Sequence, residues 1–203
     1  TLRCKEVRVR TSIKLGSLSQ LVECRHQNPY ELLGPHQISE NGREALAVRA
    51  FLPEGTRAWV VDPSHTGPSR PMRKIHPAGI FEAICPTDAI NDKNRYMIRM
   101  TDQDGKKTVM HDPYSFPQML TDYDMYLLGE GKHWHSYERL GAQLRTVDGV
   151  DGVNFAVWAP NATSISVVGD FNGWDMRRHP MQKHMFNGFW ELFVPGLGEG
   201  TLY

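Results

Sequence analysis

Residues 154–168 read NFAVWAPNATSISVV, two strand-like runs on either side of a Pro-Asn-Ala-Thr turn. In the first run, Asn154 to Ala159, residue types alternate as they do in a strand with one buried face. The second run, Ile165 to Val168, is rich in the β-branched residues that favour strands. The sequence here predicts two strands joined by a tight loop.

The same pattern occurs earlier in the chain. Residues 47–61, AVRAFLPEGTRAWVV, match residues 154–168 at an offset of 107 positions. Residues 78–86, AGIFEAICP, likewise match residues 187–195, NGFWELFVP. Each copy reads strand, proline turn, strand, long loop, and a glycine-started strand that ends at proline. This repeat predicts an all-β chain of two consecutive immunoglobulin-like β-sandwich domains.

The repeat also sets the expected domain boundaries. The first sandwich is expected over 19–122 and the second over 147–203. The second is expected to be incomplete, because the first copy continues into further strands past Tyr96 whereas the second stops at the matching residue, Tyr203. The linker between them, 123–146, mixes aromatic and charged residues and is expected to lie against one or both sandwiches.

A short helix is expected at the start of the first domain. Residues 19–24, SQLVEC, have a helical composition, and Ser19 could cap them. The preceding residues, 1–18, show no stable pattern and are expected to form a leader or a disordered arm.

A candidate binding turn follows the second strand of the second copy. Residues 167–175 read VVGDFNGWD, in which Asn-Gly predicts a tight turn that ends at a tryptophan. An indole at such a turn can cover the C–H face of a pyranose ring while neighbouring polar groups bond the hydroxyls. The candidate carbohydrate-binding residues are Trp174, Asn172, Trp190 and Lys183.

The other tryptophans of this copy have structural alternatives. Trp190 lies beside Phe189 in a strand, so one of the two is expected to face the core, and the pattern leaves open which one. Trp158 is expected in the core.

Composition excludes several function classes. The 203 residues carry 23 basic and 23 acidic side chains, so no net charge points to nucleic acid or to an anionic membrane. No apolar run approaches the roughly 20 residues that cross a bilayer. The three cysteines, Cys4, Cys24 and Cys85, lack metal-type spacing and are expected to be reduced thiols.

Neither catalysis nor metal binding is predicted. Retaining cleavage of a glycosidic bond needs two carboxyl groups about 5 Å apart on a rigid frame, whereas the aspartates here lie mostly in turns, where they bond their own backbone. His133 and His135 could share a metal on a strand, but a structural zinc site needs four ligands. We therefore assign no catalytic residue, no metal and no cofactor.

Four further motifs carry a family resemblance. In order along the chain they are NPYELLG at 28–34, DPYSFP at 112–117, YERLGA at 137–142 and WELFVPGL at 190–197. Together they resemble the amino-terminal region of bacterial glycogen branching enzymes. The second sandwich resembles the glycogen-binding module that precedes the catalytic barrel in those enzymes, and an extra sandwich before it is typical of one bacterial subgroup.

The resemblance implies a function for the parent protein. Branching enzymes transfer a cut α-1,4-glucan segment to a C6 hydroxyl, which creates an α-1,6 branch. No motif of the barrel that carries the catalytic carboxylates is found here, so this chain is expected to be inactive alone. The implied partners are α-glucan, such as glycogen or maltooligosaccharides, and the catalytic barrel of the same polypeptide. The implied location is the cytoplasm.

Within the resemblance, only Trp174 matches the family's aromatic platform. The first sandwich has VVDPSH at 60–65 in place of that turn and is expected to lack a sugar site. The alternative is a stand-alone carbohydrate-binding or scaffold module without enzymatic activity.

Overall fold

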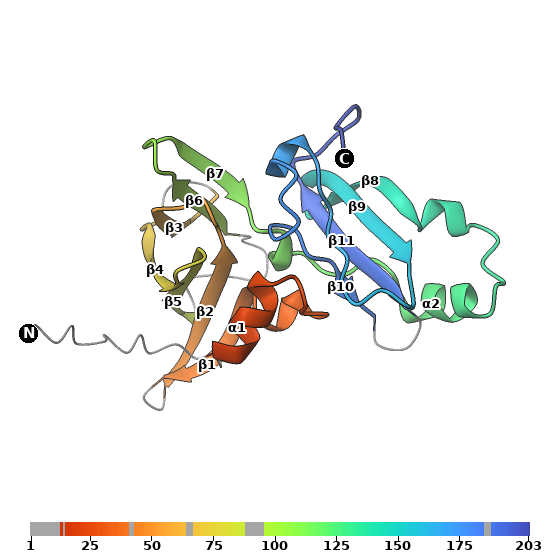
Figure 1. Ribbon diagram of the computed structural model, residues 1–203, viewed down its shortest axis with the longest axis horizontal. Coiled ribbons are helices and arrows are strands. Elements are labelled where there is room, and N and C mark those ends of the chain that lie inside the picture. The colour runs from red at the N-terminus through yellow and green to blue at the C-terminus, as the bar shows by residue number, and fades with distance from the viewer. Residues whose placement is uncertain (1–12, 14, 41–42, 64–66, 88–95, 185–187) are drawn as a thin grey trace, which may run out of the picture.

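The computed structural model describes residue 13 and residues 15–40, 43–63, 67–87, 96–184 and 188–203. Its strands pair antiparallel in two sheets, one of seven strands and one of four, and helices are few and short (Figure 1). The prediction of an all-β chain is confirmed. The two α-helices have eight residues each, and none of the described helices could span a membrane.

The first sheet folds over on itself. Its strand order is β1-β2-β5-β4-β3-β6-β7. The first half of β4 pairs with β3 and the second half with β5, and the register shifts between Lys74 and His76. The strands are β1 (Gly34–Glu40), β2 (Arg43–Phe51), β3 (Arg57–Val61), β4 (Arg70–His76), β5 (Ile80–Pro86), β6 (Met97–Thr101) and β7 (Lys107–His111).

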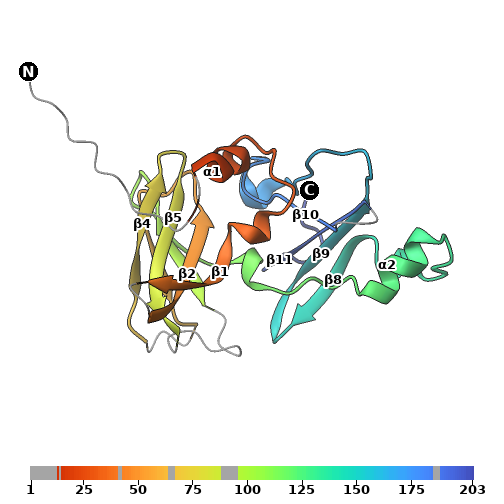
Figure 2. The ribbon, with the colours of Figure 1, turned by 90° about the horizontal axis from the view of Figure 1, so that it is seen from below.

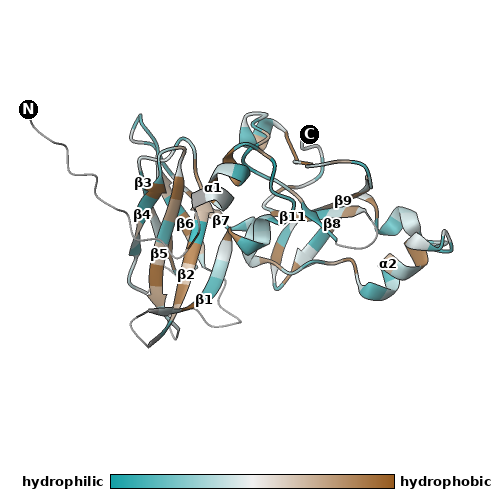
Figure 3. Ribbon diagram, turned by 60° about the horizontal axis from the view of Figure 1, so that its bottom comes forward, coloured by the Kyte–Doolittle hydropathy of each residue, from teal (hydrophilic) through white to brown (hydrophobic). Residues whose placement is uncertain are grey.

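A hydrophobic core lies between the two layers of this folded sheet. Val48 and Ala50 from β2 and Phe81 from β5 pack in one cluster with Val60 of β3 and Ile98 of β6. The hydrophobic residues along β2 and β5 are visible in Figure 3. Burial of this apolar area is the main stabilisation of the first domain.

The second sheet has the order β10-β11-β9-β8. It consists of β8 (Gly141–Val147), β9 (Val150–Trp158), β10 (Gln182–Lys183) and β11 (Phe189–Pro195). Both faces of β11 are covered. Residues 190, 192 and 194 pack into one cluster, while Phe189 packs on the opposite side against Leu120 and Ala156.

The internal repeat extends to strand register. Phe51 pairs with Ile80 in the first sheet, and the matching residues Trp158 and Phe189 pair in the second. In both sheets the residue that follows the first member of this pair donates its backbone N–H to a glycine carbonyl. Leu52 N donates to Gly79 O at 2.7 Å, and Ala159 N donates to Gly188 O at 2.9 Å. The two copies therefore share one backbone plan.

The copies differ at the second predicted strand. Residues 165–168 do not form a strand; Ser166 makes an isolated bridge to Pro180 instead. In the first copy, β3 is flanked by β4 and β6. In the second, the backbone–backbone bonds of residues 165–167 to described residues go to one segment, 179–181, through Val167 N to His179 O and Met181 N to Ile165 O. One-sided pairing leaves the strand incomplete, which β-branched composition alone does not reveal.

The region expected as a linker contains regular structure. It includes helix α2 (Asp122–Gly129), a 3-10 turn at Ser136–Glu138 and most of β8, which begins at Gly141 rather than near 147. The residues of β8 are largely half-buried or exposed, so the strand lacks the alternation that would have predicted it. The division into domains itself stays a prediction.

The first helix, α1 (Leu15–Val22), begins before the expected cap, so Ser19 lies inside the helix and does not cap it. Leu18 and Leu21 are fully buried, and their packing fixes the helix. The rest of the expected arm, residues 1–12 and 14, lies outside the described residues.

A continuous hydrophobic cluster joins the two units. Leu18 and Leu21 of α1 and Ile80 of β5 pack in the same cluster as Trp190 and Leu192 of β11. In Figures 1 and 2, α1 lies at the junction of the two sheets, whereas α2 lies on the far side of the second sheet. The two sheets therefore share buried surface and are not independent bodies.

Candidate carbohydrate-binding turn

The turn at residues 169–174 places one tryptophan at the surface. It contains a 3-10 helix, Asp170–Asn172, followed by Gly173 and Trp174, both with positive φ (63° and 59°). The Trp174 side chain is 55% exposed, and its Nε1 donates to Asp170 Oδ1 at 2.9 Å. The indole is therefore held at its polar edge while much of its ring remains accessible, as a sugar platform requires.

Asn172 holds the turn together from inside. It is buried; its Oδ1 accepts the Gly169 N–H (2.9 Å), and its Nδ2 donates to Val167 O (2.8 Å) and to His179 Nδ1 (2.9 Å). All of these partners belong to the protein, so the structure does not support a direct sugar contact by Asn172. Its amide closes the turn that presents Trp174.

His179 completes this closure as a neutral ring. Because Nδ1 accepts from Asn172, the ring proton belongs on Nε2. Burial, followed by the positive charge of Arg178, lowers the pKa of His179 to about 3. The hydrogen bond to Asn172 therefore persists across the neutral and mildly acidic range.

Trp190 and Lys183 form a separate pair, in which a half-buried lysine lies over a buried indole. Trp190 is 0% exposed, and its Nε1 donates to Ala159 O at 3.0 Å. Lys183 Nζ lies 5.3 Å from the centre of the Trp190 ring and 3.4 Å from Pro160 O. The ring of Trp190 has no surface to offer a sugar, so the structure does not support it as a contact. Both faces of β11 are covered, which is why Phe189 and Trp190 are buried together.

Trp158 contradicts the expectation that it belongs to the core. Its side chain is 61% exposed. Trp158 points to the same side of β9 as Ala156, but it lies two residues further along, at the end of the strand. Its counterpart in the first copy, Phe51, is buried beside α1. Sequence reasoning missed Trp158 as a surface aromatic because the strand pattern does not show where covering elements stop.

Trp158 is one of the residues that line an apolar groove of about 380 Å³. Its walls include Phe155, Val167, Met181 and Tyr203. The Tyr203 ring packs edge-on against Phe155, with centroids 5.0 Å apart. This groove is a second exposed aromatic surface on the second unit.

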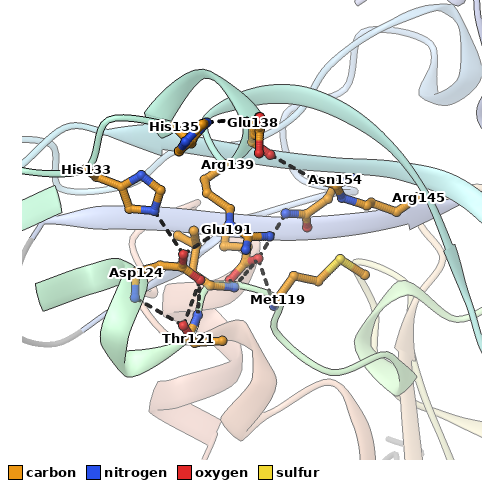
Figure 4. A network of polar contacts seen from close by, with 11 residues as sticks. Met119, Thr121, Asp124, His133, His135, Glu138, Arg139, Arg145, Asn154 and Glu191 are labelled. Atoms are coloured by element: carbon orange, nitrogen blue, oxygen red, sulfur yellow. Dashed lines mark hydrogen bonds and ion pairs between the residues drawn. The ribbon is translucent and has the colours of Figure 1, made fainter. Parts of the chain in front are cut away.

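Two buried carboxylates of the second unit, Glu191 and Asp124, are structural. Glu191 Oε1 accepts the N–H group of Met119 (2.8 Å) and the amide of Asn154 (3.0 Å), as Figure 4 shows. It also accepts the N–H of Leu120 (3.0 Å), and His184 Nε2 lies 3.0 Å from Oε2. These bonds tie the segment before α2 onto β11. Glu191 is buried and fully engaged, so it is not placed to attack or protonate a substrate.

Asp124 organises the second network in Figure 4. It forms a capping box with Thr121 and accepts from His133 Nε2 and Arg139 Nε, each at 3.0 Å. Burial alone would raise the pKa of Asp124, but the hydrogen bonds from His133 and Thr121 and the charge of Arg139 lower it to about 2. His135 turns instead toward Glu138, so the two histidines face different partners.

A folded seven-stranded sheet joined to a second sheet with an exposed tryptophan turn is the architecture of β-sandwich modules, a class that includes carbohydrate-binding modules. Comparison with known proteins gives the family. Residues 14–114 match the N-terminal domain of alpha-1,4-glucan branching enzyme GlgB, and residues 139–203 match carbohydrate-binding module 48, the isoamylase N-terminal domain. Residues 14–114 therefore belong to the family of GlgB N-terminal domains and residues 139–203 to carbohydrate-binding module family 48, which confirms the resemblance.

Relatives named 1,4-alpha-glucan branching enzyme GlgB match nearly the whole chain. The protein of Rhodopirellula baltica is 49% identical over 193 residues, which are 95% of this chain and 26% of that protein. That of Thermosynechococcus vestitus is 46% identical over 92% of this chain and 24% of its own length. That of Methylococcus capsulatus is 46% identical over 91% and 23%. The chain thus spans about a quarter of the length of these relatives.

Proposed function

We propose that this chain is the N-terminal, non-catalytic region of a cytoplasmic 1,4-α-glucan branching enzyme and that it contacts α-glucan through Trp174. The observation that carries the proposal is the exposed indole, fixed by Asp170 on a turn that Asn172 closes. A preorganised aromatic face loses little conformational entropy when a sugar ring stacks on it.

The proposed role of the parent enzyme is to transfer α-1,4-glucan segments into α-1,6 branches on glycogen. In that role the two modules support the catalytic barrel of the same polypeptide and present glucan to it. The continuous core between them favours a rigid support. The chain alone is expected to show no branching activity in an iodine-staining assay with amylose.

The test of glucan contact is a calorimetric titration of the chain with maltoheptaose. The wild type is expected to bind saturably, and Trp174→Ala is expected to abolish the heat signal. Trp134→Ala is the matched control, because Trp134 is 90% exposed but lies on the α2 side of the second sheet. Binding that survives in Trp174→Ala, or no binding by the wild type, would reject the site.

The groove at Trp158 supports a second candidate position for the same ligand. Trp158→Ala in the same titration separates the two positions. Loss of binding in Trp158→Ala alone would move the site from the turn to the groove.

A further inference from the structure

Residues 178–183, here called the closing segment, lie between the tryptophan turn and the first sandwich. On one side, Pro180 bridges to Ser166, and His179 O accepts Val167 N at 3.0 Å. The ring of His179 accepts from Asn172, the residue that closes the turn. The closing segment is therefore bonded directly to the base of the turn.

On its other side, the closing segment is held by the first domain at three points. Tyr114 Oη donates to Pro180 O at 3.0 Å in a buried contact. Lys183 N donates to Gln27 O at 2.9 Å, and Arg178 Nη1 lies 3.7 Å from Glu54 Oε1. The Tyr114 bond is the central one, because Pro180 is next to His179.

Tyr114 is itself fixed within the first domain. Asp112 accepts its backbone N–H at 3.0 Å, and the ring of Tyr30 packs edge-on at 5.3 Å. Gly34, with φ of 86°, approaches so closely that a Cβ there would lie 2.6 Å from Tyr114 O. Burial raises the pKa of Tyr114, so its hydroxyl remains a donor throughout the accessible pH range.

We propose that the first sandwich positions the glucan-binding turn of the second, with Tyr114 as the positioning residue that acts through Pro180 and His179. The proposal rests on the proposed function of Trp174. It gives the first domain, which has no tryptophan turn of its own, a role in sugar binding without a sugar contact.

Removing the Tyr114 hydroxyl leaves the buried carbonyl of Pro180 without this donor. Because an unsatisfied buried acceptor is costly, we expect the backbone at Pro180 to move toward another donor. The closing segment then shifts, and the turn shifts with it. We expect Tyr114→Phe to weaken maltoheptaose binding about fivefold to tenfold, while the indole itself is unchanged.

Two variants control for general effects of losing a buried tyrosine hydroxyl. Tyr96→Phe removes the hydrogen bond to Asp112 Oδ2, which lowers stability, but it leaves the Tyr114 N–H bond to Asp112 Oδ1 and the Tyr114 bond to Pro180 in place. Tyr30→Phe alters the ring that packs on Tyr114 but leaves the bond to Pro180 in place. Both are expected to bind maltoheptaose with wild-type affinity.

The direct readout is ¹⁹F NMR of chain labelled with 5-fluorotryptophan, with the Trp174 resonance assigned by Trp174→Phe. A purely structural loss of stability does not move this resonance in the folded state. We expect Tyr114→Phe to shift or broaden the Trp174 signal and Tyr96→Phe to leave it in place.

An unchanged Trp174 resonance in Tyr114→Phe, or an equal loss of affinity in Tyr96→Phe, would overturn the positioning role. If the wild type binds no maltoheptaose, the proposed function fails, and the resonance alone decides whether the first domain positions the turn. The two failures are thus distinguishable.

Discussion

Glu82 and Glu191 occupy the same position of the repeat, on β5 and β11, and both carboxylates are buried, yet they have different partners. Glu82 pairs with Arg49 of the neighbouring strand at 3.0 Å. In the second copy the residue matching Arg49 is Ala156, and Glu191 instead accepts backbone N–H groups of Met119 and Leu120. Glu82 is thus neutralised by an arginine of its own sheet. Glu191 instead holds the segment that contains Met119 and Leu120 against β11.

Glu191→Gln should weaken this connection. A glutamine turns an amide donor toward groups that are themselves donors, so we expect the free energy of unfolding to fall by about 2 to 4 kcal/mol. Chemical denaturation followed by fluorescence measures it. Glu199→Gln, an exposed change in the same unit, should stay within about 0.5 kcal/mol of the wild type. Equal stability of the two variants would contradict the role given to Glu191.

Asp112 predicts an inverse dependence of stability on pH. Burial raises the pKa of Asp112 to about 6, against the opposing hydrogen bonds from Tyr96 and Tyr114. Because the folded state holds the proton more tightly, this contribution is present below the unfolded pKa of about 4 and is lost as pH rises to about 6. The loss is roughly 3 kcal/mol.

The measurement compares the wild type with Asp112→Asn at pH 4.5 and pH 7. The variant does not ionise, so the stability of the wild type relative to the variant should fall with rising pH. Other titrating groups, His179 among them, cancel in this comparison. A relative stability that rises or stays constant would contradict the raised pKa.

Gly188→Ala should be costly because two effects coincide there. Gly188 has φ of 69°, and a Cβ would lie 2.5 Å from Pro160 Cα. We expect a loss of about 2 to 4 kcal/mol in the free energy of unfolding. Gly198→Ala, where a Cβ meets nothing within 4 Å, is the control. The thermal midpoint of each variant reports the difference, and equal midpoints would refute the prediction.

The apolar groove at Trp158 predicts self-association of this chain. The groove is lined by Phe155, Val167 and Tyr203 and by the start of β8, which is an edge strand among the described strands, so this surface invites pairing with another copy. Sedimentation velocity at increasing concentration should show dimers or larger species. Trp158→Lys should reduce them, and a clean monomer of the wild type at high concentration would argue against the prediction.

The sequence was sufficient for the repeat strands that are paired on both sides in their sheets. The match between 47–61 and 154–168 predicted β2, β3 and β9, and the match ending at Pro86 and Pro195 predicted β5 and β11. It failed at 165–168, because a strand also depends on the neighbours that pair with it, and those differ between the copies.

The site was predictable only in part. The Asn-Gly pair correctly located the turn, and the exposed Trp174 followed from it. The sequence led us to expect Trp158 in the core and to consider Trp190 as a sugar contact, whereas the structure exposes Trp158 and buries Trp190. This was not predictable, because both indoles lie in similar strands and only the elements that cover each strand distinguish them. Asn172 has the residue type of a sugar ligand, but its three bonds within the chain appear only in three dimensions.

The bonds from Met119 and Leu120 to Glu191 have a consequence for sequence variation. Their donors are main-chain amides, which every residue except proline supplies. The side chains at 119 and 120 can therefore change during evolution without loss of these two bonds, while Glu191 cannot. Among homologous sequences, this contact between the domains should be visible as one invariant acid opposite a pair of positions restricted only in excluding proline.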